Sequence, residues 1–389
     1  MTTDESSRRR VTRRRLLGAG ATVGAAALAG CNGLLGQTQD EQKAPGGRKA
    51  VGQIGSGRSP FGDREITGGT SMADMPNMSG ELTVYSARGE ALVGELIAFI
   101  QDLYADLTIK VRYNSAAELV NQIETEGDNS PADVFFTVDA GSMGELKNDG
   151  RTVSLPKNVL GLVREEFRDP DGQWIGTSGR ARTIPYNTKQ FSKSDVPTDI
   201  MAFPDANEFA DNVGWAPTYS SFQSFVTAMR VLEGDAKTKR WLRGMMDLGV
   251  REYGDEFLVS QAVADGEIGA GFANHYYIQR VLAGRGGEAP IDTAFTEGDA
   301  GAIFNVAGAC VLKTAENRTL ASNFVRHLLS AEAQDYFARE TFEYPLIPGV
   351  EPIGDLPTID ELNPPKGLDL TQLSDFEGTI ELMREVGVL

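Results

Sequence analysis

Histidine and cysteine are almost absent from this chain, which has two residues of each among its 389. Zinc sites built from these two residue types are therefore excluded by the inventory. A Ser-His-Asp triad would have to use His275, because His327 lies in ordinary helical sequence, and there is no Gly-x-Ser-x-Gly motif. No glycine-rich stretch has the spacing of a phosphate-binding loop. These absences argue against the common enzyme classes and leave a surface hydrolase or metalloenzyme using His275 as the less favoured alternative.

Lysine is also scarce, since only 11 of the 37 basic residues are lysine and 26 are arginine. Against 55 acidic residues, the formal net charge is −18. Such an acidic body repels phosphate backbones, so we expect no nucleic-acid partner. An acid-rich, lysine-poor surface is typical of a halophilic protein, which stays soluble in concentrated salt because screening removes most of its self-repulsion.

No apolar run is long enough to cross a membrane as a mature helix, which needs about 20 residues. The run Leu16 to Ala29 has 14 apolar or small residues, follows Arg13 and Arg14, and ends at Cys31. Paired arginines before such a run resemble a twin-arginine export signal, and Leu28-Ala29-Gly30-Cys31 resembles a lipobox. We therefore expect residues 1–31 to be an export signal, and a lipid on Cys31 to anchor the protein to the outer face of the cytoplasmic membrane.

The remaining thiol, Cys310, lies in an apolar stretch at 307–312, so we expect it to be buried and inert. Residues 32–80 are rich in Gly, Gln, Ser, Asp and Met without a sustained apolar period. This composition predicts a flexible tether between the lipid and a folded domain at 81–389.

Strand and helix patterns alternate from Glu81 onward. Strands are expected at 82–85, 108–113 and 132–136, with helices at 91–103 and 116–126 between them. This order predicts an α/β fold with a parallel sheet, and 389 residues exceed what one core usually holds. Later elements are expected as a short strand at 183–186, a helix from Phe222 capped by Ser220 or Ser221, a helix at 261–267 and a helix ending near Leu282.

The adjacent tyrosines Tyr276 and Tyr277 stand at a predicted strand-to-helix junction. On a strand, neighbouring side chains point to opposite faces, but at a helix start both phenols can project toward one cleft. The commoner role of such a pair is packing, with one ring in the core and the other at the rim.

Several motifs in order resemble the periplasmic ferric-ion-binding proteins of ABC importers. They are 82–86 (LTVYS), 129–135 (NSPADVF), 178–182 (SGRAR), 217–218 (PT), 266–268 (GEI), 274–277 (NHYY) and 343–346 (EYPL). The resemblance implies a type II periplasmic-binding fold, with two α/β lobes joined by hinge strands and closing on a ligand. It implies a first lobe at about 81–180 plus 307–357 and a second at about 181–306 plus 358–389.

The resemblance also implies roles for individual residues. Tyr276 and Tyr277 fall on the family's paired iron ligands, and Tyr219 falls on the third tyrosine of one subgroup. In that subgroup, the position of Arg180 holds a carbonate against the metal. Another subgroup uses His and Glu, but Gly89 and Val138 stand there in this chain, so that site is excluded. Ser220 and Ser221 are candidates for an anion-binding helix start. Asp139 is the alternative to Tyr219 for completing the set of metal ligands. Further candidates for the cleft are Arg88, Arg182, Tyr186 and Asn274.

Elementary chemistry is consistent with a phenol site for iron. Fe³⁺ is a small hard cation that prefers anionic oxygen, and a phenol with a pKa near ~10 ionises at neutral pH only beside a strong charge. Three phenolates neutralise Fe³⁺, and a carbonate can pair with the planar fork of Arg180. We therefore expect a monomeric binding protein, not an enzyme, that carries Fe³⁺ with an anion such as carbonate to the permease and ATPase of an ABC importer. The alternative is a protein for an oxyanion or small organic solute, with Arg180, Arg182 and the Ser220 helix start as anchors.

The export signal predicts distinct outcomes for two sets of variants. Arg13→Lys with Arg14→Lys should leave the precursor inside the cell, because the paired arginines are the address that the export system reads. Cys31→Ala should instead give protein without lipid, detected by membrane fractionation and by the mass of the N-terminal peptide. Normal membrane-anchored protein from both variants would refute the assignment.

Overall fold

The alternating strands and helices after Glu81 fold into the first lobe of the protein. This computed structural model describes residues 51–374 and 376–389, and its strands β2, β1 and β3 pair in parallel in that order. The elements of this lobe are β1 (Gly80–Ser86), α1 (Glu90–Asp102), β2 (Leu107–Tyr113), α2 (Ala116–Glu126), β3 (Val134–Thr137), α3 (Ala140–Asn148), β4 (Thr152–Val153), α4 (Lys157–Leu160), α9 (Arg318–His327) and α10 (Ala331–Tyr336). Every residue of β3 is buried, as expected of a central strand covered on both faces.

The second lobe has its own sheet and its own core. Its elements are β6 (Val213–Trp215), α5 (Ser220–Glu233), α6 (Asp235–Asp247), β7 (Arg251–Glu252), α7 (Glu256–Asp265), β8 (Ala270–Gly271), β9 (Ala273–Asn274), α8 (His275–Gly284), β10 (Ile291–Ala294) and α11 (Glu377–Val386). Aromatic rings fill this core, with Trp241 edge-on to Phe225 and Phe272 at centroid distances of 5.5 Å. Burial of such rings is the main stabilising contribution of the lobe.

Short helices of other types complete the described chain. They are the 3-10 helices η1 (Met72–Asp74), η2 (Gly127–Asn129), η3 (Glu165–Phe167), η4 (Lys193–Asp195), η5 (Ile200–Asp205), η6 (Asn207–Phe209), η7 (Ala300–Ala302) and η9 (Leu370–Ser374), and the π-helix η8 (Phe337–Thr341). Within the described ranges, no helix combines the length and the apolar run that crossing a membrane requires.

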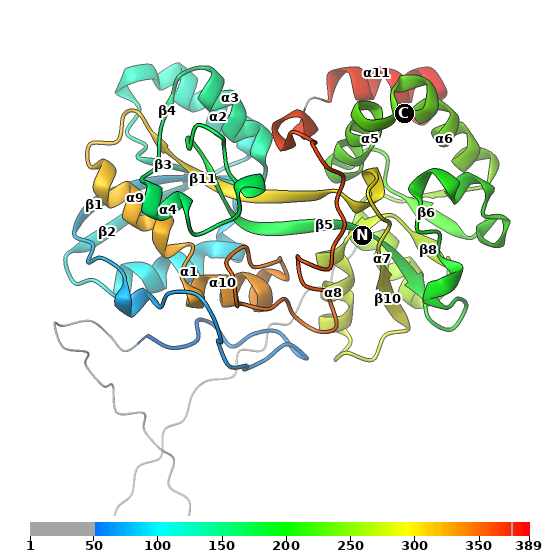
Figure 1. Cartoon of the computed structure of the whole chain (residues 1–389), viewed down its shortest axis with the longest axis horizontal. Helices are drawn as coiled ribbons and strands as arrows, with labels where there is room; N and C mark the ends of the chain where they lie inside the picture. Colours follow the sequence, from blue (N-terminus) through cyan, green and yellow to red (C-terminus); the bar gives the residue numbers. More distant parts are fainter. Residues whose placement is uncertain (1–50, 375) are drawn as a thin grey trace, which may run out of the picture. The chain divides into compact units, whose positions relative to one another are not determined.

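Two long antiparallel strands connect the lobes. β5 (Ile175–Asn187) and β11 (Phe304–Leu312) pair with each other, and the register shifts between Ala307 and Gly308. β11 also pairs with β3 of the first lobe, whereas β5 continues to β8 of the second. Figure 1 shows these two strands running between the two groups of elements. The short strand expected at 183–186 is therefore the end of the longer strand β5. The polar residues at 178–182 interrupt the apolar pattern, so the first part of this strand was not predicted.

The chain returns to the second lobe later than expected. Ile359 and Leu362 pack against the core of the first lobe, and Leu370 contacts both cores. Only from Leu373 onward do buried side chains join the core of the second lobe. The chain was expected to re-enter the second lobe at 358, but it does so near residue 370.

The segment at 51–79 is not a tether. It buries Ile54, Met72, Met75 and Met78, and Arg64 pairs with Asp335 of α10 at 2.6 Å. The predicted flexible tether is wrong for these residues, because isolated apolar anchors stabilise the segment without any helical or strand period. Residues 32–50, and the export features Arg13, Arg14 and Cys31, lie outside the described residues.

Two further expectations concern single positions. α7 begins at Glu256, five residues before the expected start, because Asp255 caps it by accepting from the Leu258 N–H at 2.8 Å. Cys310 is fully buried, as predicted, and burial raises the pKa of its thiol to about 12.

The hinge predicts a position that tolerates no side chain. Gly179 on β5 pairs with Val306 on one side and with Tyr344 on the other, and a Cβ there would lie 2.1 Å from Phe304 Cζ. We expect Gly179→Ala to lower the free energy of unfolding by about 1–3 kcal/mol, the usual cost of overpacking. Thermal unfolding measures this effect.

The control is Gly284→Ala at the end of α8, where an added Cβ meets nothing within 4 Å. It should leave the unfolding temperature unchanged or raise it slightly, because alanine is the better helix former. Equal behaviour of the two variants would contradict the tight packing at the hinge.

Candidate metal centre

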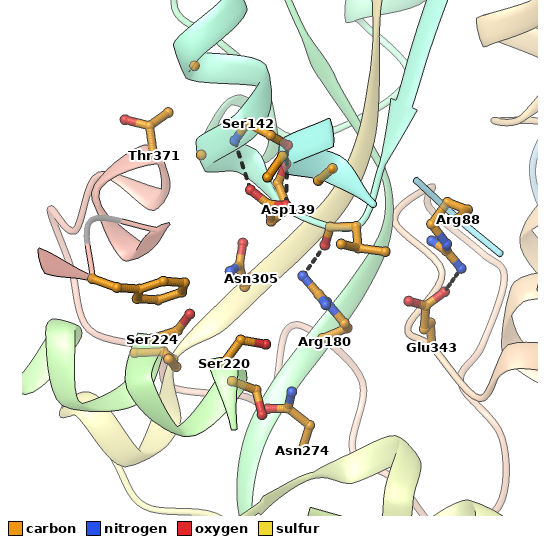
Figure 2. A pocket seen from close by; sticks show the side chains of 18 of the residues that line it. Arg88, Asp139, Ser142, Arg180, Ser220, Ser224, Asn274, Asn305, Glu343 and Thr371 are labelled. Carbon is orange, nitrogen blue, oxygen red and sulfur yellow. Dashed lines mark hydrogen bonds and ion pairs between the residues drawn. The ribbon is translucent and has the colours of Figure 1, made fainter. Parts of the chain in front are cut away.

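A cavity of about 1060 Å³ lies between the two lobes and the hinge strands. Figure 2 shows Asp139 and Ser142 on one wall, Ser220 and Asn274 on the opposite wall, and Arg180 on a hinge strand between them. The sequence-predicted residues that line it are Tyr219, Tyr276, Tyr277, Arg180, Ser220, Ser221, Arg88, Asp139 and Asn274. Two predicted candidates, Arg182 and Tyr186, lie elsewhere.

Three phenols form one cluster on the second-lobe wall. The hydroxyls of Tyr219 and Tyr277 are hydrogen-bonded to each other, and their rings meet edge to face at 6.1 Å. The rings of Tyr276 and Tyr277 lie 4.3 Å apart between centroids. Asn274 Nδ2 donates to the Tyr276 hydroxyl at 3.3 Å. The fold thus brings the hydroxyl oxygen of Tyr219 next to those of Tyr276 and Tyr277, which lie more than fifty positions later in the chain.

The starts of two helices carry these phenols. Tyr219, with extended backbone angles (φ −85°, ψ 134°), is the N-cap residue of α5, so the helix begins at Ser220 and not at Phe222 as expected. Asn274 is the N-cap residue of α8, with Tyr276 and Tyr277 in its first turn. Neither N-cap side chain bonds to its helix. The unpaired first-turn N–H groups leave partial positive charge at both helix starts, which favours an anion there.

Burial governs how the phenols ionise. Desolvation raises the pKa of Tyr277 far above its ordinary value, and neighbouring Tyr276 and the hydrogen bond to Tyr219 raise it further. Burial also raises the pKa of Tyr219. Both groups are therefore protonated at neutral pH without a bound cation. Among the described residues, no group of three or more His, Cys, Asp or Glu side chains could hold a metal ion.

Three buried polar atoms of cavity-lining residues have no hydrogen-bond partner. They are Arg180 Nε, Ser221 Oγ and Arg280 Nε. Arg180 also donates through Nη2 to the carbonyl of Val138 in the first lobe. A buried donor without a partner costs about 1–3 kcal/mol, so this arrangement favours a ligand that accepts hydrogen bonds.

Arg280 is a site residue that the sequence did not single out. Its guanidinium carbon lies 5.6 Å from the ring centroids of both Tyr276 and Tyr277. Spacings of four and three residues on α8 place it on their face of the helix, and this helical spacing is the signal that could have identified it. Its positive charge therefore lies beside both phenol rings, on the wall of the cavity.

Arg88 lines the cavity, but its side chain is buried and already paired. It pairs with Glu343 at 2.5 Å and donates to Ser178 Oγ at 3.0 Å. Burial alone raises the pKa of Glu343, but the charges of Arg88 and Arg180 outweigh it and hold that pKa below its usual range. Glu343 also lines the cavity; it opens the motif at 343–346, but it was not among the residues predicted for the site.

Arg182 stabilises the site without lining it. It is buried against the Phe225 ring of α5 at 4.8 Å and forms an ion pair with the buried carboxylate of Glu256. The other oxygen of Glu256 accepts from the backbone N–H of Asn274 at 3.0 Å. This one ion pair therefore ties the start of α5 to the start of α8.

The remaining candidates have structural partners. Tyr186 donates to Asp292 at 3.1 Å within the second lobe, and burial together with that carboxylate raises its pKa to about 12. Asp139 caps α3 by accepting from the Ser142 N–H at 2.8 Å. His275 is fully buried outside the cavity lining, and burial lowers its pKa to about 4. A hydrolase using His275 is therefore excluded by its position.

Comparison with known proteins identifies the family. Residues 129–371 match the model of the bacterial extracellular solute-binding proteins. The chain belongs to this family. This solute-binding protein is 30% identical over 316 residues to the major ferric iron-binding protein of Neisseria meningitidis, covering 79% of this chain and 93% of the relative.

Solved structures give the same result for the fold. Iron-bound HitA from Pseudomonas aeruginosa matches with a TM-score of 0.69 and 30% identity, covering 80% of this chain and all of that one. A Trichodesmium protein, IdiA (FutA), in complex with iron and citrate ligands, matches with a TM-score of 0.69 and 25% identity over 79% of this chain and 99% of that one. The predicted two-lobed periplasmic-binding fold is confirmed. Because this family binds solutes, the protein is a carrier and not an enzyme.

Proposed function

We propose that this chain captures Fe³⁺ between its lobes for an ABC importer. The observation that carries the proposal is the cluster of Tyr219, Tyr276 and Tyr277 at two uncapped helix starts. The relatives named for ferric iron support the same cargo.

Charge balance favours a trivalent cation. Three phenolates carry three negative charges, which equal the charge of Fe³⁺, and anionic oxygen is the ligand type that this hard ion prefers. A cation of lower charge would leave buried phenolates uncompensated. Since the free phenols of Tyr219 and Tyr277 are protonated, iron must displace their protons as it binds.

A synergistic anion completes the proposed site. Arg180 and Arg280 have buried Nε–H groups without partners, and Ser221 Oγ stands at the start of α5. A carbonate with two negative charges would neutralise both guanidinium groups and accept these hydrogen bonds. The citrate in the Trichodesmium complex shows an anion accompanying iron in a relative.

Delivery follows from the family and from the N-terminus. An extracellular solute-binding protein of an importer passes its cargo to a membrane permease driven by an ATPase, so we infer these partners. We further infer that Arg13 and Arg14 direct export and that Cys31 carries the lipid anchor. Hinge closure on β5 and β11 would bring the first-lobe wall, including Asp139, onto the loaded tyrosines.

Replacing single tyrosines tests the iron site. Tyr→Phe at 219, 276 or 277 removes one oxygen and keeps the ring, so each variant should fold normally. Substituting a residue that only hydrogen-bonds to a metal ligand typically lowers metal affinity by about 10–100-fold. Each Tyr→Phe variant removes a ligand itself, so its loss of iron affinity should be larger. The phenolate-to-iron absorption band should shift at the same time. Metal analysis, visible spectra and chelator competition measure these effects.

The matched control is Tyr186→Phe, which removes a phenol that is bonded to Asp292 outside the cavity. Its iron affinity and absorption band should equal those of the unmodified protein. Native-like folding and unchanged iron affinity in Tyr276→Phe/Tyr277→Phe would sink the ferric proposal and favour an oxyanion held by Arg180 and Arg280.

Acid should release the cargo. Because the pKa values of Tyr219 and Tyr277 are raised above the ordinary 10, both free phenols hold their protons throughout the neutral and acidic range. Each phenolate ligand then costs one proton, so affinity should fall by up to about tenfold per phenolate for each unit of decreasing pH.

Competition with a chelator of known protonation, between pH 5 and 8, measures this slope. The slope of the logarithm of affinity against pH gives the number of protons released per iron bound. Tyr219→Phe should lower this number by one, whereas Tyr186→Phe should not change it. A flat profile in the unmodified protein would mean that phenolates do not hold the metal.

A further inference from the structure

The N-terminal segment, residues 51–79, is fastened to the first lobe by charged groups. Arg64 Nε pairs with Asp335 of α10 at 2.6 Å, and Arg339 Nη2 donates to the carbonyl of Ile54 at 2.6 Å. Ser71 Oγ donates to Glu332 at 2.5 Å. Asp335 is fully buried, so its bonds to the segment are shielded from solvent and salt.

The same segment reaches the second lobe near the candidate metal centre. Phe61 packs edge to face on Phe342 with 5.8 Å between ring centroids. Phe342 belongs to a small buried cluster with Ala338 and Ile353, against which both Phe61 and Tyr276 pack. A ring from the N-terminal segment and a candidate iron ligand thus share one apolar cluster.

Phe342 has an unusual backbone conformation that needs support. Its φ of 62° is in the left-handed region, where it ends the π-helix η8 with its N–H bonded to the carbonyl of Phe337. A bulky residue adopts this conformation only where its surroundings hold it. The flanking Thr341 and Glu343 both line the cavity. Phe61 on one side and the Arg58 guanidinium at 5.6 Å cover its ring.

The packing beside Phe342 is incomplete. A second cavity, of about 360 Å³, lies between Arg58 and Ser59 of the segment and Phe257 and Ala283 of the second lobe. Removing the Phe61 ring would open the apolar cluster beside this space. Tyr276, which packs against the same cluster, would lose part of the support that this cluster gives its ring.

HitA has the same fold, although part of this chain has no counterpart in it. The whole of HitA is matched by 80% of this chain, so the remaining 20% of 389 residues, about 78, has no counterpart there. This length is close to the chain that precedes β1 at Gly80.

We propose that Phe61 is a positioning residue for Tyr276, holding its phenol toward the metal centre through the cluster around Phe342. The inference rests on the proposed iron-binding function. It assigns the N-terminal segment to the binding site, as a clamp that is anchored on the first lobe and supports a ligand of the second.

Phe61→Ala in the full chain tests this assignment. We expect about a tenfold loss of iron affinity, within the range of outer-shell substitutions in metal sites, together with a shifted absorption band in the folded, iron-loaded protein. Phe61→Leu keeps an apolar group at this position and should restore most of the affinity. Arg64→Gln, which weakens the anchor to Asp335, should change affinity and band in the same direction as Phe61→Ala.

The matched control is Phe99→Ala on α1, a half-buried ring on the first-lobe core. It should lower the unfolding temperature without moving the band or the affinity. If Phe61→Ala behaves in the same way as Phe99→Ala, the positioning role is wrong while iron binding stands. If the unmodified protein itself shows neither iron affinity nor the band, the proposed function fails instead.

Discussion

Burial of the paired hydroxyls of Tyr219 and Tyr277 governs the chemistry of this protein. Neutral phenols can stay buried because each accepts or donates a hydrogen bond, whereas a buried phenolate without a cation would be costly. These two phenols are therefore protonated in the free protein, and in the proposed site they ionise only for a ligand whose charge offsets the desolvation. Two helix starts with free N–H groups and the nearby guanidinium of Arg280 reduce that cost without removing it.

A buried ion pair outside the cavity lining holds the two helix starts in place. Arg182 and Glu256 are both fully buried, and together they connect the aromatic face of α5 to the first residue before α8. Removing one partner of such a pair leaves an uncompensated charge, so the two residues are fixed as a unit. The proposed three-tyrosine site benefits from this rigidity, because mobile helix starts would lose conformational entropy when the ligand binds.

The sequence predicted most of the first lobe because its strands and helices follow clean periods. α2 has the predicted bounds, and α1 begins and ends within a residue of them. The residues around the cavity were expected from the motif resemblance, since no period marks Tyr219 as a partner of Tyr277. What long-range packing decides was not predictable locally. Arg88 has the sequence surroundings of a loop charge, yet Glu343, 255 positions later, neutralises it in the interior.

The segment at 51–79 illustrates the same limit in another way. Its four buried apolar anchors are spaced by 18, 3 and 3 residues, and the three methionines are too few to produce a sustained helical or strand signal. Only the tertiary partners on α10 and η8 show why a Gly- and Ser-rich stretch is ordered there. Composition predicted its polarity correctly and its conformation wrongly.

All three phenols belong to the second lobe, and this separates two kinetic properties of the carrier. In the proposed site the first encounter with iron needs only this lobe, so the association rate would be set by access to its wall and not by the speed of the hinge. Residence time depends on the opposite wall and on Arg180, which bridges to Val138. A membrane partner that holds the lobes apart would therefore shorten the lifetime of the loaded state while leaving the capturing surface intact for the next ion.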